Sequence, residues 1–381
     1  MTNQEVTLLT PGPTPIHPRA MAAFYWPMRS HMDPDIFAYN DQIVLNLHKL
    51  YKTAPGAFTS LLSGTGSLGM EVGFANLLEP GDKVLIVSNG VFGERMIEMT
   101  QRLGSEVIPV RFPSSQPVDV DKVREIAHQT MPKVIAIVHG ETSTGVMNPV
   151  PEISEIAAEV DALYSVDAVT TVGMLPFDMA AWNIDYAYTG SQKCLSAPPG
   201  LAPVAFSKRA MEIVSNRKTP VMTWYSDAVG MQAYWQPGER KYHHTVPIHL
   251  HWATGEAIKL TLEEGIPKRT KRVRQVGNAA LRTLETVGFS AHIPESYRLP
   301  TVLAVKLPEG LDDAKVRHQL RHDYFISVTG GLGDTAGKIW RLGLMGENAR
   351  AEHYARLMEA LAHILNVPHL PHVFDEMMAV A

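Results

Sequence analysis

The stretch Tyr186-Ala-Tyr-Thr-Gly-Ser-Gln-Lys-Cys-Leu-Ser-Ala-Pro-Pro-Gly200 places a lysine between two expected strands. It begins as a β-rich run, breaks at Gly190, presents Lys193, and ends in a rigid turn at Pro198-Pro-Gly200. A loop held at both ends can keep an amine oriented and partly desolvated. Desolvation favours the neutral, nucleophilic form that Schiff-base chemistry needs. An exposed surface lysine is the alternative at this stage.

Length and composition indicate an ordinary globular chain of two domains. The 381 residues exceed the size at which one core usually keeps growing. Hydrophobic residues make up 45% and the net charge is −5, so no basic excess points to nucleic acid. The single cysteine, Cys194, excludes internal disulfides and Cys-based zinc clusters and favours a reducing, cytoplasmic setting. We expect neither secretion nor a membrane span, because no leader and no run of about 18 apolar residues is present.

A glycine- and hydroxyl-rich segment precedes an expected helix. Ser63-Gly-Thr-Gly-Ser67 opens a run in which apolar residues recur at helical spacing up to Leu78. Free N–H donors, a favourable dipole and hydroxyl donors at a helix start are what a phosphate cradle requires. A glycine-rich cap without a ligand is the alternative. No Gly-Lys-Ser/Thr or Gly-x-Gly-x-x-Gly signature is present, so nucleotide binding has little support.

Apolar strands then alternate with amphipathic helices. Val84–Val87, Val107–Val110 and Val134–Val138 are followed by expected helices at 93–103, 121–129 and 152–159. Strands that are apolar throughout are buried on both faces, which with intervening helices predicts a mainly parallel α/β sheet. In such sheets ligands collect at the carboxyl ends of the strands.

Polar residues follow those strand ends. One strand runs into His139-Gly-Glu-Thr-Ser-Thr-Gly145, the next ends at Asp167, and Tyr186–Tyr188 leads to Lys193. A buried carboxylate such as that of Asp167 needs a cationic partner, although a helix-capping aspartate is the alternative. Cradle, carboxylate and lysine at one edge together favour pyridoxal 5'-phosphate, because they would hold its phosphate, protonate its ring nitrogen and bind its aldehyde.

The motifs resemble those of class V, fold-type I aminotransferases, most closely the alanine–glyoxylate and serine–glyoxylate branch. The resemblance covers nearly the whole chain, in the order Pro11-Gly-Pro-Thr14, Ser63-Gly-Thr-Gly66, Leu78-Glu-Pro-Gly-Asp82, His139-Gly-Glu-Thr-Ser-Thr-Gly145, Val166-Asp167, Gly190-Ser-Gln-Lys193, Ala197-Pro-Pro-Gly200, Tyr242-His-His-Thr-Val-Pro247 and Thr329-Gly-Gly-Leu-Gly333. It implies an N-terminal arm (1–20), a large domain with a mainly parallel seven-stranded sheet (21–255) and a small C-terminal α+β domain (256–381).

The resemblance also implies residue roles. The cofactor phosphate would be bound by Thr65, Gly66, Ser67 and Gln192, and from the partner subunit of a homodimer by Tyr242 and Thr245. Phe92 would stack on the pyridine ring, Thr142 would hydrogen-bond near the ring oxygen or substrate, and Asp167 would pair with the ring nitrogen. Arg341 would bind the substrate carboxylate bidentately, with a backbone donor from Gly12. A core aromatic, a strand-end turn and a solvated arginine are the respective alternatives for Phe92, Thr142 and Arg341.

The implied activity is ping-pong transfer of an amino group from alanine or serine to a 2-oxo acid, with glyoxylate as the favoured acceptor. Transamination of 2-aminoethylphosphonate with pyruvate is an alternative, but that branch carries Trp-Arg-Phe-Thr in place of Tyr242-His-His-Thr245. Ureidoglycine–glyoxylate transamination is another, although its asparagine before the paired histidines is replaced by Tyr242. A non-catalytic α/β binding protein is a third, and the intact Lys193 and Asp167 pair argues against it.

Four further segments carry expectations. The prolines around Gly12 predict an extended arm without a regular element. The basic run Lys268–Arg274 is expected to form a solvated helix face rather than a nucleic-acid site. A metal site at the adjacent histidines His243 and His244 is disfavoured, because neighbours on an extended chain point to opposite sides. The tail 366–381 is expected to be loosely ordered.

Overall fold

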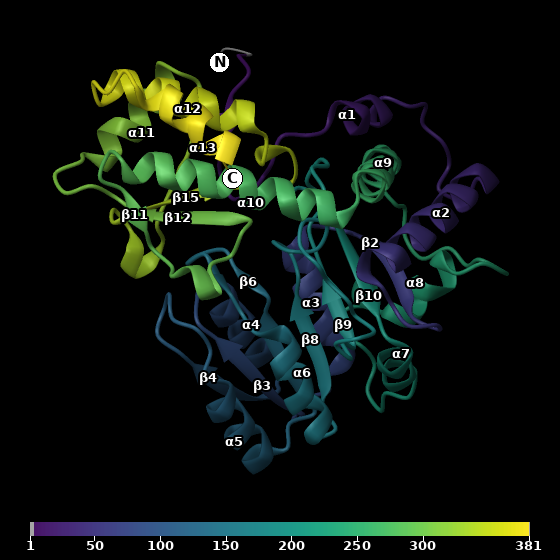
Figure 1. Ribbon diagram of the computed structural model, residues 1–381. Coiled ribbons are helices and arrows are strands. Elements are labelled where there is room, and N and C mark those ends of the chain that lie inside the picture. Colours follow the sequence, from purple (N-terminus) through teal and green to yellow (C-terminus); the bar gives the residue numbers. More distant parts are fainter. Residues whose placement is uncertain (1–3, 381) are drawn as a thin grey trace.

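A seven-stranded sheet in the order β2-β10-β9-β8-β5-β3-β4 forms the centre of the larger body (Figure 1). The computed structural model describes residues 4–380. The strands are β2 (Phe58–Ser63), β3 (Lys83–Ser88), β4 (Glu106–Arg111), β5 (Val134–Val138), β8 (Leu163–Asp167), β9 (Tyr186–Tyr188) and β10 (Leu201–Phe206). Strand β10 runs opposite to the other six, which confirms the expected mainly parallel, seven-stranded sheet.

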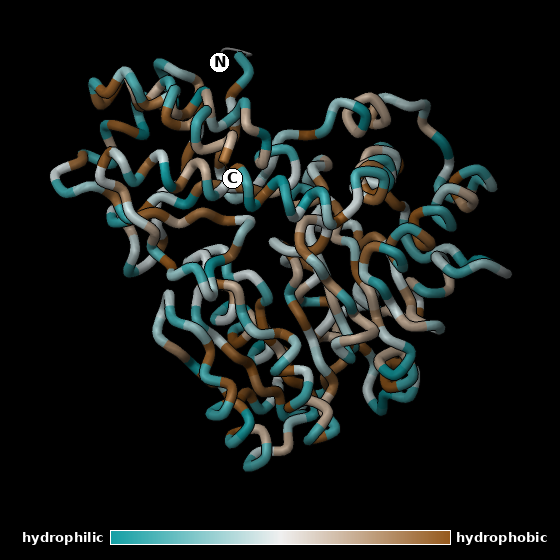
Figure 2. The backbone as a smooth tube through the Cα atoms, viewed as in Figure 1, coloured by the Kyte–Doolittle hydropathy of each residue, from teal (hydrophilic) through white to brown (hydrophobic). Residues whose placement is uncertain are grey.

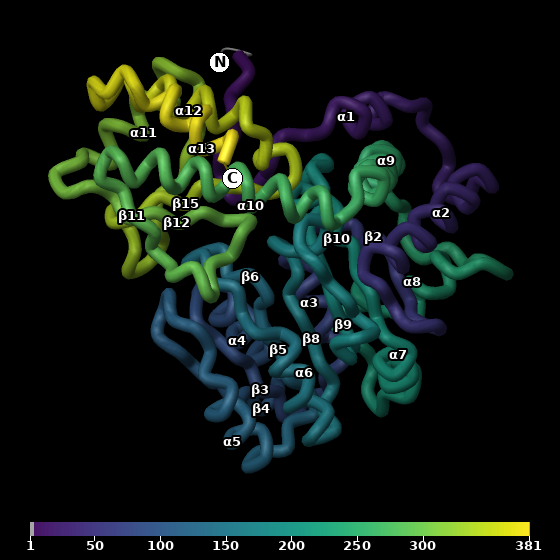
Figure 3. The backbone as a smooth tube through the Cα atoms, viewed as in Figure 1, coloured from purple at the N-terminus to yellow at the C-terminus, as the bar shows by residue number. Residues whose placement is uncertain are grey.

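Helices bury both faces of this sheet, as its apolar strands require. Every residue of β5, β8, β9 and β10 is buried. The connecting helices are α3 (Gly66–Leu77), α4 (Val91–Arg102), α5 (Val120–Thr130) and α6 (Val150–Glu159), close to the ranges that periodicity predicts (Figure 3). Helix α3 lies so close to β9 that a Cβ on Gly73 would sit 2.1 Å from the Tyr186 ring. The middle of α3 therefore packs directly against the strand that leads to Lys193.

Further helices flank the β2 edge of the sheet and lead into the second body. They are α1 (Pro18–Phe24), α2 (Pro34–Tyr51), α7 (Lys208–Ser215), α8 (Ala228–Trp235) and α9 (Ile248–Glu264), with a 3-10 turn η1 at Trp224–Ser226. Helix α9 packs against α1 and α2. The predicted domain boundary at 255/256 falls inside α9, and the division into domains stays a prediction.

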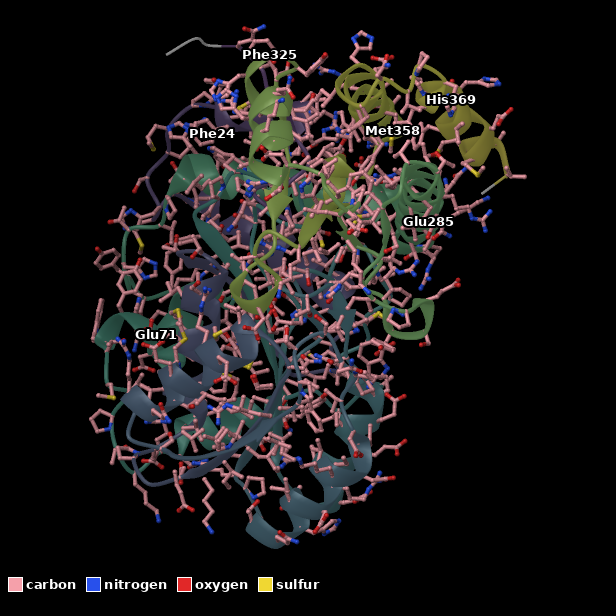
Figure 4. The ribbon with its side chains drawn as sticks, turned by 90° about the vertical axis from the view of Figure 1, so that its left-hand side faces the viewer. Phe24, Glu71, Glu285, Phe325, Met358 and His369 are labelled. Atoms are coloured by element: carbon pink, nitrogen blue, oxygen red, sulfur yellow. The ribbon has the colours of Figure 1, made fainter. Side chains whose placement is uncertain are left out.

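The second body is a four-stranded antiparallel sheet in the order β11-β12-β15-β14 with its own apolar core. Its elements are β11 (Ser290–Ala291), β12 (Val302–Lys306), β14 (Thr329–Gly330), β15 (Ile339–Gly343), α10 (Ile266–Glu285), α11 (Asp313–His322), α12 (Ala351–Ile364), α13 (Leu370–Val380) and the 3-10 turns η2 (Glu295–Tyr297), η3 (Gly333–Thr335) and η4 (Gly346–Asn348). Figure 2 shows brown, hydrophobic segments inside both bodies. In the side view of Figure 4, Glu285 and Met358 of this body lie above Glu71 of α3.

Three expectations from the sequence are wrong. The tail is not loose, because α13 packs on α10 and α12 and buries Leu370 and Phe374 almost completely. The arm does contain a short regular element, β1 (Thr7–Leu8), which pairs in parallel with β13 (Ile326–Ser327) of the second body. The basic run is not wholly solvated, because Arg269 is buried.

The burial of Arg269 has a clear cause. Its guanidinium donates to the carbonyl oxygens of Gly173 at 2.5 Å and Cys194 at 2.6 Å, and pairs with Glu264 at 2.8 Å. It therefore ties α10 to the loop that carries Lys193. Along residues 4–380, no helix combines the length and apolar character needed to cross a bilayer.

Candidate active site

A cavity of about 240 Å³ opens at the carboxyl edge of the large sheet. The predicted site residues that line it are Thr65, Gly66, Ser67, Phe92, Thr142, Asp167, Gln192 and Lys193. They come from the starts of α3 and α4, the hairpin β6 (Gly140–Glu141) to β7 (Val146–Met147), the end of β8 and the loop after β9. The tertiary structure thus brings together groups that are up to about 130 residues apart in sequence, as expected for a parallel sheet.

Lys193 is held on a rigid loop. Its backbone N–H donates to the Gly190 carbonyl oxygen, and its own carbonyl oxygen accepts from the hydroxyl of Thr14 on the arm at 3.1 Å. The side-chain amine donates to the carbonyl oxygen of Pro11 at 2.5 Å. Burial lowers the pKa of Lys193, and the nearby cation Arg341 acts in the same direction. A lower pKa increases the fraction of Lys193 in the neutral amine form that nucleophilic attack requires.

Asp167 is buried at the end of β8, with 4% of its surface exposed. One carboxylate oxygen accepts from the Val169 amide at 2.9 Å, and the other accepts from the Tyr188 hydroxyl at 2.9 Å. Burial raises the pKa of Asp167 to about 6, although these hydrogen bonds and the charge of Lys193 oppose the rise. The site therefore holds an incompletely compensated anion, which favours binding of a cationic group beside it.

The start of α3 has the features of a phosphate cradle. Thr65 is the N-cap, but its hydroxyl makes no capping bond within the described chain. The first amide that bonds back is that of Leu68, to the Thr65 carbonyl oxygen at 2.8 Å, so the amides of Gly66 and Ser67 precede it. The buried amide oxygen of Gln192 has no hydrogen-bond partner among residues 4–380. The free amides and the Thr65 hydroxyl suit the oxygens of a bound phosphate ester. The Gln192 oxygen, which is an acceptor, suits a neighbouring hydroxyl or water.

Phe92 and Arg95 form one wall of the cavity on the first turns of α4. The Arg95 guanidinium lies over the Phe92 ring, 4.8 Å from its centroid, and donates to the Ser67 hydroxyl at 3.2 Å. Phe92 is half-buried rather than part of the closed core. An aromatic face is therefore presented to the cavity, with a cation beside the cradle.

Arg341 reaches the same edge from the second body. It lies on β15, is 5% exposed, and donates to the Gly330 carbonyl oxygen and to the Thr142 carbonyl oxygen, each at 3.0 Å. Burial lowers the pKa of Arg341. Gly12 approaches Lys193 so closely that a Cβ there would lie 2.5 Å from the amine, and its φ of +95° also favours glycine.

Tyr242 and Thr245 do not line this cavity in their own chain. Both are exposed, with Tyr242 packed against the His31 ring at 5.1 Å. Their predicted role in a partner subunit stays a prediction. Between these two residues, the Nδ1 atoms of His243 and His244 form a hydrogen bond of 2.7 Å. The Nε2 atom of His244 forms a second hydrogen bond, of 3.0 Å, with the Ser63 hydroxyl. In the part of the chain that the structure describes, no cluster of three or more His, Cys, Asp or Glu side chains could hold a metal ion.

Sequence reasoning overlooked three residues around the cavity. Arg95 lies one helical turn after Phe92, and that i, i+3 spacing was the available signal. Glu141 lies in the motif 139–145, and its position there was the available signal. The bond from Tyr188 to Asp167 depends on strand register, for which the sequence offers no signal. Cys194 is fully buried, and burial raises the pKa of its thiol to about 12.

Fold and site together define the fold-type I aminotransferase class. The chain belongs to the class-V aminotransferase family, because the family model described as Aminotransferase class-V matches residues 48–345. It is 35% identical over 361 residues to the alanine–glyoxylate aminotransferase of Oryctolagus cuniculus, covering 94% of this chain and 92% of the relative. The protein is therefore an aminotransferase of a family that uses pyridoxal phosphate.

Two solved structures are similar over their whole length. The alanine–glyoxylate aminotransferase from Nostoc sp. has a TM-score of 0.92 and 38% identity, with 96% of each chain covered. The ureidoglycine–glyoxylate aminotransferase from Bacillus subtilis has a TM-score of 0.96 and 30% identity, with 99% of each chain covered. The similarity extends across both bodies, so the second body belongs to the shared architecture.

The raised pKa of Asp167 predicts a stability change in the cofactor-free protein. Between the unfolded pKa of about 4 and the folded pKa of about 6, the folded state binds more protons, so this residue lowers stability as pH rises through that window. Asp167→Asn removes that cost, and Tyr188 can accept from the new amide. We expect the variant to be about 1 to 3 kcal/mol more stable than wild type at pH 8 and equal near pH 4.

Urea unfolding of the cofactor-free proteins at pH 4, 6 and 8 measures this difference. The exposed Asp334→Asn is the control and should show no pH-dependent gain. Equal stabilities of Asp167→Asn and wild type at every pH would show that the carboxylate is not desolvated.

Proposed function

We propose that the protein binds pyridoxal 5'-phosphate and transfers an amino group from alanine or serine to glyoxylate. The observation that carries the proposal is the convergence of the Lys193 amine, the buried Asp167 carboxylate and the open α3 start in one cavity. The family supports the reaction class, and the similarity to alanine–glyoxylate aminotransferases supports glyoxylate as the acceptor.

The cofactor would be held at both ends by residues of this chain. Gly66, Ser67, Thr65 and Gln192 would bind the phosphate, and the free Gln192 oxygen would face a hydroxyl or a bridging water. Asp167 would pair with the protonated ring nitrogen, which would satisfy its uncompensated charge. Phe92 would cover one face of the ring, and Thr142 would lie near its oxygen or the substrate.

When bound, the cofactor supplies an electron sink for the substrate carbon that loses its proton. Lys193 would then act as base and acid: its amine, with a pKa lowered by burial, would take a proton from the substrate Cα and deliver it to the cofactor carbon on the other side of the amino nitrogen. The carbonyl oxygen of Pro11 orients the amine at 2.5 Å. Arg341 fixes the substrate carboxylate, which sets the carbon near Lys193.

Ureidoglycine as donor is the second candidate, and one observation favours it. The Bacillus subtilis ureidoglycine–glyoxylate enzyme matches this chain over 99% of its length with a TM-score of 0.96. Tyr242 in place of the asparagine that precedes the paired histidines argues for the smaller donors. Both candidates share glyoxylate as acceptor.

The protein is further proposed to be a cytoplasmic homodimer. Large apolar side chains are exposed on neighbouring segments, among them Tyr25 at 77%, Met28 at 64%, Trp224 at 66% and Tyr242 at 59%. Ring contacts join these segments, since Tyr242 packs on His31 and Trp224 stacks on His243. Several exposed large apolar side chains on contacting segments support an interaction site there. A partner that covers it would bring its Tyr242 and Thr245 to the cradle.

Lys193→Ala tests the covalent role. We expect loss of turnover with the fold retained, because an alanine can neither bind the cofactor aldehyde nor move a proton. Borohydride reduction of the wild type should attach the cofactor to Lys193, as read by peptide mass mapping. The exposed Lys208→Ala is the control and should keep activity. An adduct on any other lysine would refute the assignment.

Arg341→Lys tests the substrate site and the donor class. Lysine keeps the charge but loses the fork, so the binding of alanine or serine should weaken by about 1.5–3 kcal/mol. Donor half-reactions, followed by the absorbance change of the cofactor to its amine form, isolate this step from the acceptor. We expect rapid conversion by alanine or serine in wild type and little by 2-aminoethylphosphonate. Rapid conversion by the phosphonate alone, or by ureidoglycine alone, would change the assigned donor.

Met28→Lys tests the dimer. A charge on the exposed apolar surface should shift the species from two 42.0 kDa chains towards one and weaken cofactor binding, because the partner residues are lost. Sedimentation velocity and cofactor titration measure the two effects. Met131→Lys is the matched control, because this methionine is also exposed, at 58%, but lies at the end of α5. A monomeric wild type with full activity would overturn the dimer.

A further inference from the structure

Glu141 is a buried carboxylate that the cavity does not expose. It ends strand β6, and its surface is 0% exposed. One oxygen accepts from the Ser143 amide at 3.1 Å and from the Ser143 hydroxyl at 2.5 Å, while the other accepts from the Phe92 amide at 3.1 Å. Burial raises the pKa of Glu141, and these donors act in the opposite direction. The charge of Asp167 also raises the pKa of Glu141, so the three donors are the groups that stabilise its ionised form.

Helix α4 obtains its N-terminal cap from this hairpin. Its own N-cap residue, Gly90, has no side chain that could accept a hydrogen bond. Instead the Val91 amide donates to the Ser143 hydroxyl oxygen at 3.1 Å, and the Phe92 amide donates to Glu141. A Cβ on Gly90 would lie 2.4 Å from the Glu141 side chain, so only a glycine at this position leaves room for the observed approach of the two segments. Glu141 therefore accepts one of the two capping hydrogen bonds at the start of α4, at the residue whose ring lines the cavity.

The same hairpin holds the arginine from the second body. The residue after Glu141, Thr142, accepts from Arg341 through its carbonyl oxygen at 3.0 Å. The negative charge of Glu141 also favours the charged guanidinium, against the effect of burial. The buried Glu141 carboxylate thus acts on helix α4, beside the large sheet, and on Arg341 of strand β15 in the small sheet.

We propose that Glu141 is a positioning residue that fixes the ring-stacking Phe92 and the carboxylate-binding Arg341 in one geometry. The proposal rests on the proposed function for the roles of those two residues. Glu141 contacts neither the cavity nor the reacting atoms, so it acts through its neighbours. Substrate carboxylate and cofactor ring are thereby held at a constant separation, which near-attack geometry requires.

Glu141→Gln separates the two functions of the carboxylate. The amide has one acceptor oxygen, so its NH₂ group must face a donor at Phe92 or at Ser143, and the charge near Arg341 is lost. In the cofactor-free protein, we expect amide hydrogen exchange of residues 89–95 to be about 3- to 30-fold faster, as for a lost helix cap. In the loaded enzyme, we expect KM for the amino donor to rise about 10-fold, with a smaller change in kcat.

Ser143→Ala and Glu155→Gln provide the comparison. Ser143→Ala removes the cap on Val91 but keeps the Glu141 charge, so exchange over 89–95 should rise while donor KM stays near wild type. Glu141→Asp also keeps the charge and should spare KM more than glutamine does. Glu155 is exposed on α6, and Glu155→Gln should change neither quantity.

Unchanged exchange over 89–95 together with unchanged KM in Glu141→Gln would overturn the proposal, as would a uniform rise in exchange over the whole sheet. If Glu141→Gln does not fold, Glu141→Asp tests the same contacts, because its shorter side chain cannot reach both Phe92 and Ser143. Unchanged exchange over 89–95 together with unchanged KM in Glu141→Asp would then overturn the proposal. The exchange measurement needs no cofactor and no turnover. Failure of the proposed function would appear separately, as a wild type that does not transfer amino groups.

Discussion

The burial of the Asp167 carboxylate at the end of a parallel strand is the constraint on which this site depends. The strand must be apolar to lie inside the sheet, yet it ends in an anion with almost no access to water. Two hydrogen bonds compensate that anion only in part, and its pKa stays raised at about 6. Burial lowers the pKa of Lys193 below its ordinary value. Both groups are therefore destabilised in their charged forms until a complementary ligand occupies the cavity.

Rigidity around that cavity comes from segments distant in sequence. The arm binds the lysine loop through Thr14 and Pro11, and Arg269 of α10 binds the carbonyl oxygen of Cys194 on the same loop. The hairpin that follows β5 receives Arg341 from the second body. Each contact places a backbone oxygen where a cation or hydroxyl can reach it. The two bodies consequently share polar contacts at the site itself, so the position of one affects the chemistry prepared by the other.

The large sheet could be predicted from local patterns because its strands are apolar on both faces and its helices carry ordinary periodicity. The tail could not. Leu370 and Phe374 stand in a segment punctuated by prolines, and its helix is stabilised by burial against α10 and α12 rather than by its own propensity. Arg269 was missed for a related reason. A basic run is normally solvated, and only the carbonyl oxygens of Gly173 and Cys194 make burial of that guanidinium favourable.

At the site, the sequence by itself determined the chemistry-bearing groups: a lysine on a constrained loop, a carboxylate at a strand end and a glycine-rich helix start are local features. Their meeting in one cavity follows from the parallel sheet. Only the tertiary structure decided which groups support them. The Tyr188 bond to Asp167 requires one strand register, and the bonds of Glu141 to Phe92 and Ser143 require a hairpin to meet a helix start. Such contacts depend on side-chain distances across separate elements, which no local pattern encodes.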